Sequence, residues 1–196
     1  MLGTPKRDRQ TERREATRQE ILAAAWAAAR EHGLAQVTLR GVADRVGMQA
    51  PSLYSHFESK NAIYDAMFGQ AWAEFLESSL AGETPPPRTA RSALRRYARL
   101  FFDFAVADLA RHQLMNQRTI PGFVPSEQSY APAVAVIRLL RERVASYGIS
   151  RDQDVDLFTA IIGGLVDAQL ANDPGGERYA RLLDRAIDMY ADNLGL

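Results

Sequence analysis

Hydrogen-bonding side chains gather in one short stretch of the chain, from Thr38 to Lys60. The stretch reads as a short helix, a turn at Gly47, a second short helix that opens at Pro51, and the first residues of a third helix. The second short helix is small, polar on one side, and tipped with groups that donate or accept hydrogen bonds. Base edges in the DNA major groove present donors and acceptors to a helix of this kind. We therefore expect this stretch to read DNA.

The helices around this stretch must hold it in position. An Ala-rich segment from about Gln10 to His32 has apolar residues at helical spacing and stops at Gly33. Thr38 is expected to cap the next helix, whose apolar residues follow the i, i+3, i+4, i+7 rule: Leu39, Val42, Ala43 and Val46. Two short helices packed on a longer one form a helix-turn-helix domain. A domain of about 50 residues is marginally stable alone, so it should rest on the next helix, which Ser59 caps.

Two motifs in this region resemble those of the TetR family of transcriptional regulators. They are Thr38-x-Arg40-x-Val42-Ala43-x-x-x-Gly47 and Ser52-Leu53-Tyr54-x-His56-Phe57-x-x-Lys60. The resemblance covers Gln10 to about Phe68 by motif, and the remainder by the number and length of the helices. It implies a ligand-responsive regulator that binds double-stranded DNA at a palindromic operator. We expect a repressor that a small hydrophobic molecule releases from that operator, with activation left open.

The resemblance also implies roles for individual residues. Arg40 would reach a phosphate or a guanine edge, where its fork matches two acceptors. Residues at the start of the recognition helix would face base edges, and these are Gln49, Ala50, Pro51 and Ser52. Residues that would bond phosphates are Thr38, Tyr54, His56 and Lys60. Phosphate contacts set the position on the duplex, whereas base contacts set the choice of sequence.

The sequence departs from the family pattern, and a second interpretation stays open. Gly41 stands where the family usually has an acidic residue, Ala50 offers only a methyl group, and Glu58 would repel phosphate. Taken singly, His56 would be a core histidine and Tyr54 a wedge between helices. The alternative function is a helical scaffold or adaptor that kept the helix-turn-helix shape and does not bind DNA.

The rest of the chain also reads as helices. No alternating apolar pattern of useful length appears, so we expect an all-α fold of about nine helices. Segments expected to be helical after the third are Lys60 to about Ala81, Arg88–Leu109, Arg111–Arg118, Ser126–Tyr147, Asp152–Leu170 and Glu177–Leu194. We divide the chain into an arm-like or disordered segment 1–10, a helix-turn-helix domain 11–59, and a ligand-binding and dimerisation domain 60–196. The first 18 residues carry six basic and three acidic side chains, which suits either phosphate neutralisation or a solvated tail.

Large aromatic side chains are frequent in the middle of the chain, beside a few polar ones and an irregular loop at 120–125. Apolar walls with few polar groups are typical of small-molecule sites. The candidate ligand-binding residues are Trp72, Phe101, Phe102, Phe104, His112, Asn116, Phe123 and Tyr130.

The last two predicted helices, Asp152–Leu170 and Glu177–Leu194, are apolar on wide faces. Gly163 and Gly164 lie in the middle of the first, where glycine costs about 1 kcal/mol relative to alanine. Close approach of another helix would justify this cost. We expect a homodimer formed by these two helices, with a buried helix in a monomer as the alternative. A two-fold dimer would place two recognition helices about 34–36 Å apart, on successive major-groove turns.

Composition excludes several other classes of protein. The chain of 196 residues has no Cys, so it has no disulfide and no thiolate metal site, and its three His are far apart. Asp152, Asp154 and Asp156 suit the N-terminus of a helix better than a metal site. Without a Gly-rich phosphate loop or paired catalytic carboxylates, we expect no enzyme and no cofactor. No apolar run approaches the roughly 18 residues of a membrane span and the N-terminus is charged from Lys6, so we expect a cytoplasmic protein.

Overall fold

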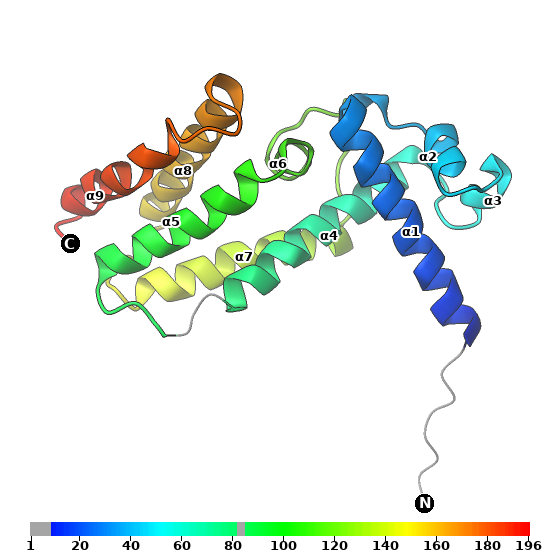
Figure 1. The fold of residues 1–196 in the computed structure, drawn as a ribbon. Helices are drawn as coiled ribbons and strands as arrows, with labels where there is room; N and C mark the ends of the chain where they lie inside the picture. Colours follow the sequence, from blue (N-terminus) through cyan, green and yellow to red (C-terminus); the bar gives the residue numbers. More distant parts are fainter. Residues whose placement is uncertain (1–8, 82–84) are drawn as a thin grey trace, which may run out of the picture.

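The computed structural model describes residues 9–81 and 85–196, and over these ranges it contains helices and no strand (Figure 1). The described α-helices are α1 (Arg9–His32), α2 (Leu39–Arg45), α3 (Ala50–Tyr54), α4 (Lys60–Ala81), α5 (Ala90–Val106), α6 (Leu109–Asn116), α7 (Glu127–Ala145), α8 (Asp152–Asn172) and α9 (Leu183–Asn193). Two short 3-10 helices, η1 (Leu34–Gln36) and η2 (Ala180–Leu182), precede α2 and α9. The expected all-α fold of about nine helices is confirmed over these ranges.

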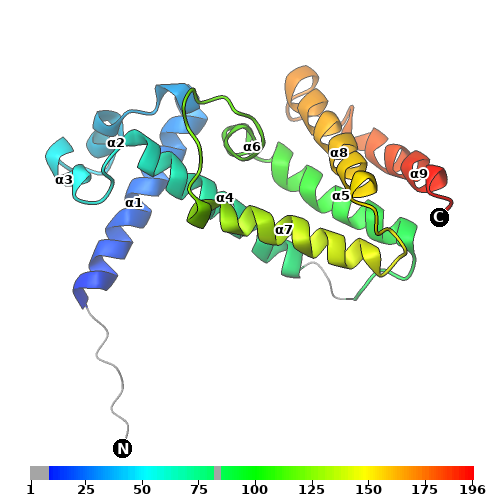
Figure 2. The ribbon, with the colours of Figure 1, turned by 180° about the vertical axis from the view of Figure 1, so that it is seen from behind.

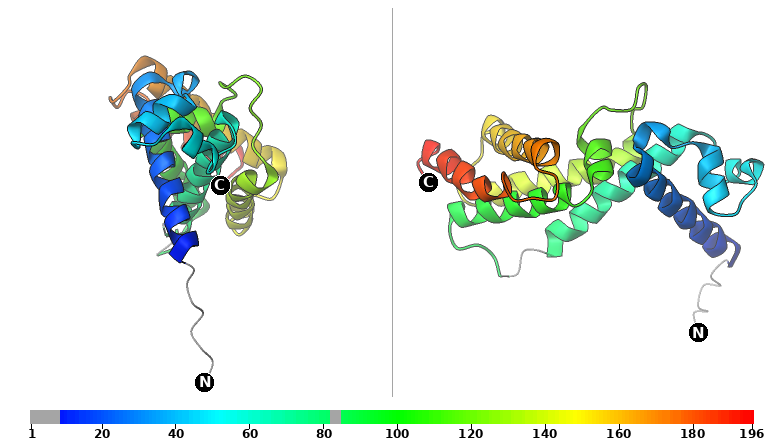
Figure 3. Two further views of the ribbon diagram at one scale, coloured as in Figure 1. Left: turned by 90° about the vertical axis from the view of Figure 1, so that its right-hand side faces the viewer. Right: turned by 45° about the horizontal axis from the view of Figure 1, so that its top comes forward.

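The molecule is elongated, with a small head at one end. Helices α1, α2 and α3 form the head, and α9 lies at the opposite end (Figures 1 and 3). Helix α4 leaves the head and packs along α7, while α5 packs against α8 and α9 (Figure 2). Helix α4 therefore joins the head to the body of the molecule.

The hydrophobic core of the head continues into the body. One cluster of buried residues joins the head to α4 and α6, and Ile21, Leu53 and Tyr64 within it are completely buried. A second cluster joins α5 to α8 and α9 through residues such as Phe158 and Ile187. Because the first cluster is shared, α2 and α3 are stabilised by contacts with α4 as well as by their own small core.

Several helix boundaries differ from the prediction for identifiable reasons. Helix α5 begins at Ala90, two residues later than predicted, because Thr89 and Ser92 form a reciprocal capping box. Helix α6 begins earlier, at Leu109, because the carboxylate of Asp108 accepts a hydrogen bond from the backbone N–H of Arg111 at 3.1 Å.

The predicted single helix Glu177–Leu194 is wrong at its start, where a 3-10 turn precedes α9. The side chain of Gln169 accepts hydrogen bonds from the backbone N–H groups of Tyr179, at 2.9 Å, and Ala180, at 3.2 Å. In a helix beginning at Glu177 these two N–H groups would belong to the first turn and have no partner within the helix, so Gln169 supplies the acceptor that holds this turn against α8.

Most of the predicted arm-like segment, residues 1–8, lies outside the described residues. Residues 9 and 10, which the prediction placed in the arm, already belong to α1. No helix of the described chain is both long and apolar enough to cross a membrane.

Candidate functional site

The turn between α2 and α3 is built from local sequence signals. The hydroxyl of Thr38 accepts a hydrogen bond from the backbone N–H of Gly41 at 3.0 Å and so caps α2. Gly47 ends the helix with a φ of 68°, a left-handed conformation that disfavours residues with a Cβ. Pro51 occupies the first turn of α3, where a missing N–H leaves no bond unmade. These features hold α2 and α3 in the geometry of a helix-turn-helix.

Helix α3 lies at the tip of the head (Figures 1 and 2). Leu53 and Phe57 anchor it, with 0% and 2% of their surfaces exposed. Tyr54, between these two anchors in sequence, is 53% exposed. Of the predicted DNA-contacting residues, those exposed are Thr38, Arg40, Gln49, Pro51, Ser52 and Tyr54, and those partly buried are Ala50, His56 and Lys60.

Two arginines of α1 hold the C-terminal end of α3 in place. Arg14 donates a hydrogen bond to the carbonyl oxygen of Ser55 at 3.0 Å, and Arg18 donates one to the carbonyl oxygen of His56. The guanidinium carbon of Arg18 also lies 4.1 Å from the ring centroid of Phe57. Carbonyl groups at a helix end lack intrahelical partners, so this arginine clamp stabilises α3.

Sequence reasoning missed the arginine clamp. It counted Arg14 and Arg18 among basic residues for phosphate neutralisation, because nothing in their spacing identifies acceptors about forty residues away. The only available signal was that positions four apart share one face of a helix.

A polar groove lies between the end of α3 and the start of α7, with α1 and α4 along it. His56 borders it, and the Nδ1 atom of this residue is buried without a hydrogen-bond partner among the described residues. Across the groove, the carboxylate of Asp65 on α4 accepts hydrogen bonds from the N–H of Ser126 at 2.6 Å, its hydroxyl at 2.8 Å, and the hydroxyl of Ser129 at 2.7 Å. The start of α7 is therefore fastened to α4 beside the head.

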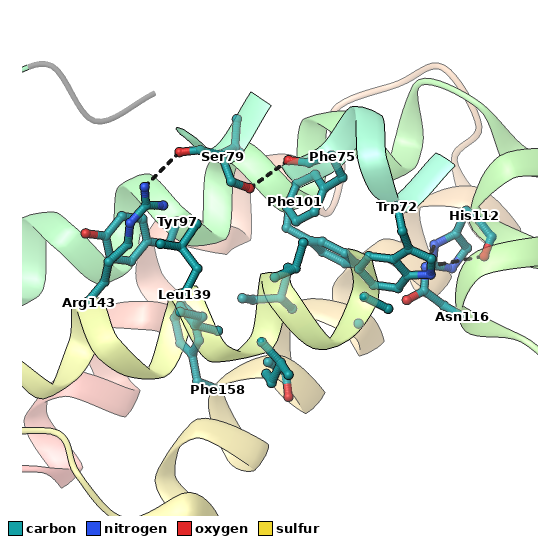
Figure 4. Close-up of a pocket in the computed structure, with 18 of the residues that line it drawn as sticks. Trp72, Phe75, Ser79, Tyr97, Phe101, His112, Asn116, Leu139, Arg143 and Phe158 are labelled. Atoms are coloured by element: carbon teal, nitrogen blue, oxygen red, sulfur yellow. Dashed lines mark hydrogen bonds between the residues drawn. The ribbon is translucent and has the colours of Figure 1, made fainter. Parts of the chain in front are cut away.

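The body contains a cavity of about 370 Å³ between α4, α5, α7 and α8. Its walls are mainly apolar and aromatic, and Figure 4 shows Trp72, Phe75 and Phe101 along one side and Leu139 and Phe158 along the other. A cavity of this size and lining is typical of sites for small organic molecules.

Polar groups lie at both ends of the cavity (Figure 4). At one end, Nε2 of the buried His112 lies 2.8 Å from a carboxylate oxygen of Asp167, which also accepts a hydrogen bond from Gln117 at 2.9 Å. At the other end, Arg143 donates a hydrogen bond to the carbonyl oxygen of Ser79 at 3.0 Å. The charged groups that line the cavity are thus bound to other groups of the protein.

The predicted ligand-binding residues divide between this cavity and other places. Those that line it are Trp72, Phe101, His112 and Asn116. Phe102 is 1% exposed in the second core, and the ring of Phe104 lies 3.7 Å from the guanidinium carbon of Arg111. Phe123 and Tyr130 line a separate cavity of about 220 Å³ under the loop that precedes α7.

Residues of α8 were missed as cavity residues because the sequence analysis assigned this helix to the dimer interface. Phe158, Gly163 and Asp167 all line the cavity. The signal that could have found them is Gly163, since glycine in a helix interior needs a reason.

Apolar side chains are exposed on α8, η2 and α9. The exposed fractions of Leu157, Leu182 and Met189 are 47%, 42% and 64%. Gly164 is also exposed, and a Cβ added there would meet no atom of this chain within 4 Å. The close helix approach expected at this glycine is therefore not made within one copy of the chain.

The acidic residues at the start of α8 are used structurally. Arg151 donates hydrogen bonds to both carboxylate oxygens of Asp154, at 2.8 and 3.1 Å. Within the described ranges, no three His, Cys, Asp or Glu residues come together as metal ligands would.

Comparisons with known proteins give one consistent result. The sequence profile described as "Bacterial regulatory proteins, tetR family" matches residues 21–67. The tetracycline repressor protein class A from transposon 1721 of Escherichia coli is 31% identical over 183 residues, covering 87% of this chain and 79% of the repressor. A protein with unknown function from Rhodococcus sp. RHA1 superimposes with a TM-score of 0.75 at 18% identity, over 90% of this chain and 93% of that one. FadR from Bacillus subtilis in complex with stearoyl-CoA gives a TM-score of 0.69 at 16% identity, over 88% and 96%.

Proposed function

The chain belongs to the TetR family of bacterial transcriptional regulators, and we propose that it is a repressor that leaves its operator when a small hydrophobic molecule binds. Members of this family are DNA-binding regulators and not enzymes. They bind operator DNA and small-molecule ligands and are typically dimers. The observation that carries the proposal is the contrast within α3, where Leu53 is fully buried while Ser52 and Tyr54 are exposed.

We propose that the residues expected to contact DNA act as two groups. Gln49, Ala50, Pro51 and Ser52 face base edges in the major groove, with Arg40 on a base edge or a phosphate. Thr38, Tyr54, His56 and Lys60 bond phosphates and set the register of α3 on the duplex. The exposure of six of these nine side chains supports the assignment.

We propose that two copies join through α8 and α9. The exposed Leu157, Leu182 and Met189 support this interface, because burying large apolar side chains against a partner removes them from water. The open space at Gly164 would let the partner's helix approach closely. Two-fold symmetry would then set the two α3 helices about 34–36 Å apart, so that each enters one of two successive major grooves.

We propose that the effector binds in the 370 Å³ cavity and acts on the head through α4. Trp72 and Phe75 of α4 border the cavity. Nearer the head on the same helix, the hydroxyl of Tyr64 donates a hydrogen bond to the carbonyl oxygen of Leu34 at 2.6 Å. A ligand that displaces α4 therefore moves the support of α2 and α3. A ligand that binds the conformation unable to bind DNA roughly 100-fold more tightly than the DNA-binding conformation shifts the equilibrium between the two conformations by about 2.7 kcal/mol.

A gel-shift titration with the DNA upstream of the protein's own transcription unit tests the proposal. The wild-type protein should retard this DNA at low salt. Replacing both Tyr54 and Lys60 by Ala should weaken binding to all DNA sequences. It should also reduce the slope of log affinity against log salt concentration by about one unit for each charged phosphate contact that is lost.

Arg138→Ala is the matched control, because Arg138 is an exposed cation on α7, far from α3. Its binding curve should match that of the wild-type protein. A wild-type protein that retards no DNA would instead favour the scaffold or adaptor function, and a double variant with unchanged binding would contradict the residue roles.

A further inference from the structure

Gly163 occupies the middle of α8 without a structural reason within this chain. Its φ is not in the left-handed region that favours glycine, and a Cβ added there would meet no atom within 4 Å. Glycine destabilises a helix interior relative to alanine. Because Gly163 lines the cavity, its missing side chain leaves bare helix backbone as part of the cavity wall.

Flat side chains form the wall on the α4 and α5 side of the same cavity. The rings of Phe75 and Phe101 meet edge to face at a centroid distance of 5.3 Å, and those of Trp72 and Phe75 at 6.3 Å. Figure 4 shows these three rings in a row along one side. Ring faces and edges pack most favourably against another flat, aromatic molecule.

The electrostatics of the cavity favour a ligand without a net charge. His112 and Asp167 are bound to one another, and Arg143 is bound to the Ser79 carbonyl oxygen. A charged ligand would lose its hydration without gaining an uncommitted opposite charge among these residues. At the His112 end, the Trp72 indole nitrogen is buried without a hydrogen-bond partner among the described residues. An indole N–H only donates, so a carbonyl or another acceptor on the ligand would satisfy it.

We infer that Gly163 determines which effectors fit, and that the effector is an uncharged planar aromatic molecule with a hydrogen-bond acceptor. The ligand lies between the aromatic residues of α4 and α5 and the bare backbone of α8, with its acceptor toward Trp72. This inference rests on the proposed function only in calling the bound molecule an effector, because binding itself does not require DNA.

Two dyes with the same fused-ring skeleton test the ligand class. Nile red is uncharged and carries a carbonyl group, whereas Nile blue carries a cationic iminium group at the same place. Fluorescence titration of the full chain should give a dissociation constant for Nile red at least about 10-fold lower than for Nile blue. Equal or tighter binding of Nile blue, or no binding of either dye, overturns the inference.

Substitutions at two adjacent glycines test the role of Gly163. Gly163→Leu should weaken Nile red binding at least about 10-fold, because its side chain occupies the cavity. Gly163→Ala should raise the melting temperature and weaken binding less. Gly164→Ala is the matched control for the cavity, since Gly164 is exposed and does not line it. Because Gly164 belongs to the proposed dimer interface, its dimer content is measured alongside by gel filtration, and its Nile red binding should stay within about two-fold of the wild-type protein.

Each remaining outcome has a distinct meaning. If Gly163→Leu binds Nile red as the wild-type protein does, or if Gly163→Ala changes only the dimer content in gel filtration, the role of Gly163 is refuted. 9-Fluorenone, a smaller uncharged aromatic ketone, should still bind Gly163→Leu, and loss of its binding in a variant that melts as the wild-type protein does would refute the claim that Gly163 selects by ligand size. If the dye results hold while the gel shift with upstream DNA fails, the proposed function is wrong and the ligand class stands. The reverse pattern overturns only the ligand class.

Discussion

The arginine clamp on α3 makes a prediction that separates support of the recognition helix from direct DNA contact. In the variant Arg18→Met, the side chain keeps an unbranched apolar stem and loses its guanidinium group. Two interactions disappear, namely the hydrogen bond to the His56 carbonyl oxygen and the contact with the Phe57 ring at 4.1 Å. A charged hydrogen bond contributes about 1.5–3 kcal/mol and a cation–π contact at a partly exposed site about 0.5–1 kcal/mol.

Only part of this local loss should reach DNA affinity, because Arg14 still holds the Ser55 carbonyl oxygen at 3.0 Å. We expect operator affinity to fall about 10- to 100-fold, which corresponds to roughly 1.4–2.7 kcal/mol. The assay is fluorescence anisotropy of labelled operator DNA at several KCl concentrations. Because Arg18 is committed to a carbonyl oxygen of its own chain, the slope of log affinity against log salt should stay unchanged.

Two further variants make the comparison decisive. Lys60→Met should reduce the slope by about 0.9 for each subunit, as expected when one phosphate contact is lost. Arg13→Met, at an exposed position of α1 outside the clamp, should change affinity by less than about three-fold. If Arg18→Met reduces the slope as Lys60→Met does, Arg18 contacts phosphate and the clamp interpretation is refuted. Unchanged affinity in Arg18→Met would refute it as well.

Two predictions concern stability. Asp65→Ala removes the acceptor of three hydrogen bonds from Ser126 and Ser129, so it should lower the free energy of unfolding in urea by about 1–3 kcal/mol. Asp65→Asn keeps an acceptor and should lose less stability. Equal losses in the two variants would contradict the role of the carboxylate. Burial raises the pKa of Tyr190 from 10.0 to about 12, so this residue stabilises the fold fully below pH 10 and loses its contribution as the pH rises toward 12. Tyr190→Phe should therefore show a shallower loss of stability over that range in guanidinium titrations, and an unchanged pH profile would contradict the assignment.

The helix-turn-helix could be predicted from the sequence because its determinants are local. The cap at Thr38, the left-handed Gly47 and the first-turn Pro51 each act within a few residues of themselves. Their spacing, together with the apolar positions of α2, specifies both the fold and the polar face of α3.

The cavity and the clamp could not be predicted because they depend on contacts between distant segments. The apolar periodicity of α8 predicts a buried face, but it does not say which neighbour covers that face. Phe123 and Tyr130 were expected in the ligand site, yet the path of the loop before α7 takes them to a second cavity. In the same way, the four-residue spacing of the basic residues Arg14 and Arg18 carries no information about their acceptors at the end of α3.

DNA cleavage from a probe on α3 tests the central claim most directly. The chain has no Cys, so Ser55→Cys, at an exposed position just after α3, can carry an iron–EDTA group that cuts nearby DNA. On a fragment that binds the protein, we predict two clusters of cuts in neighbouring major grooves, about 10–10.5 base pairs apart or a multiple of that spacing. The same probe at Ser146→Cys, exposed at the end of α7, should cut nothing. A single cluster, diffuse cutting, or no cutting from position 55 of a bound protein would contradict the claim that two outward-facing α3 helices read one face of a duplex.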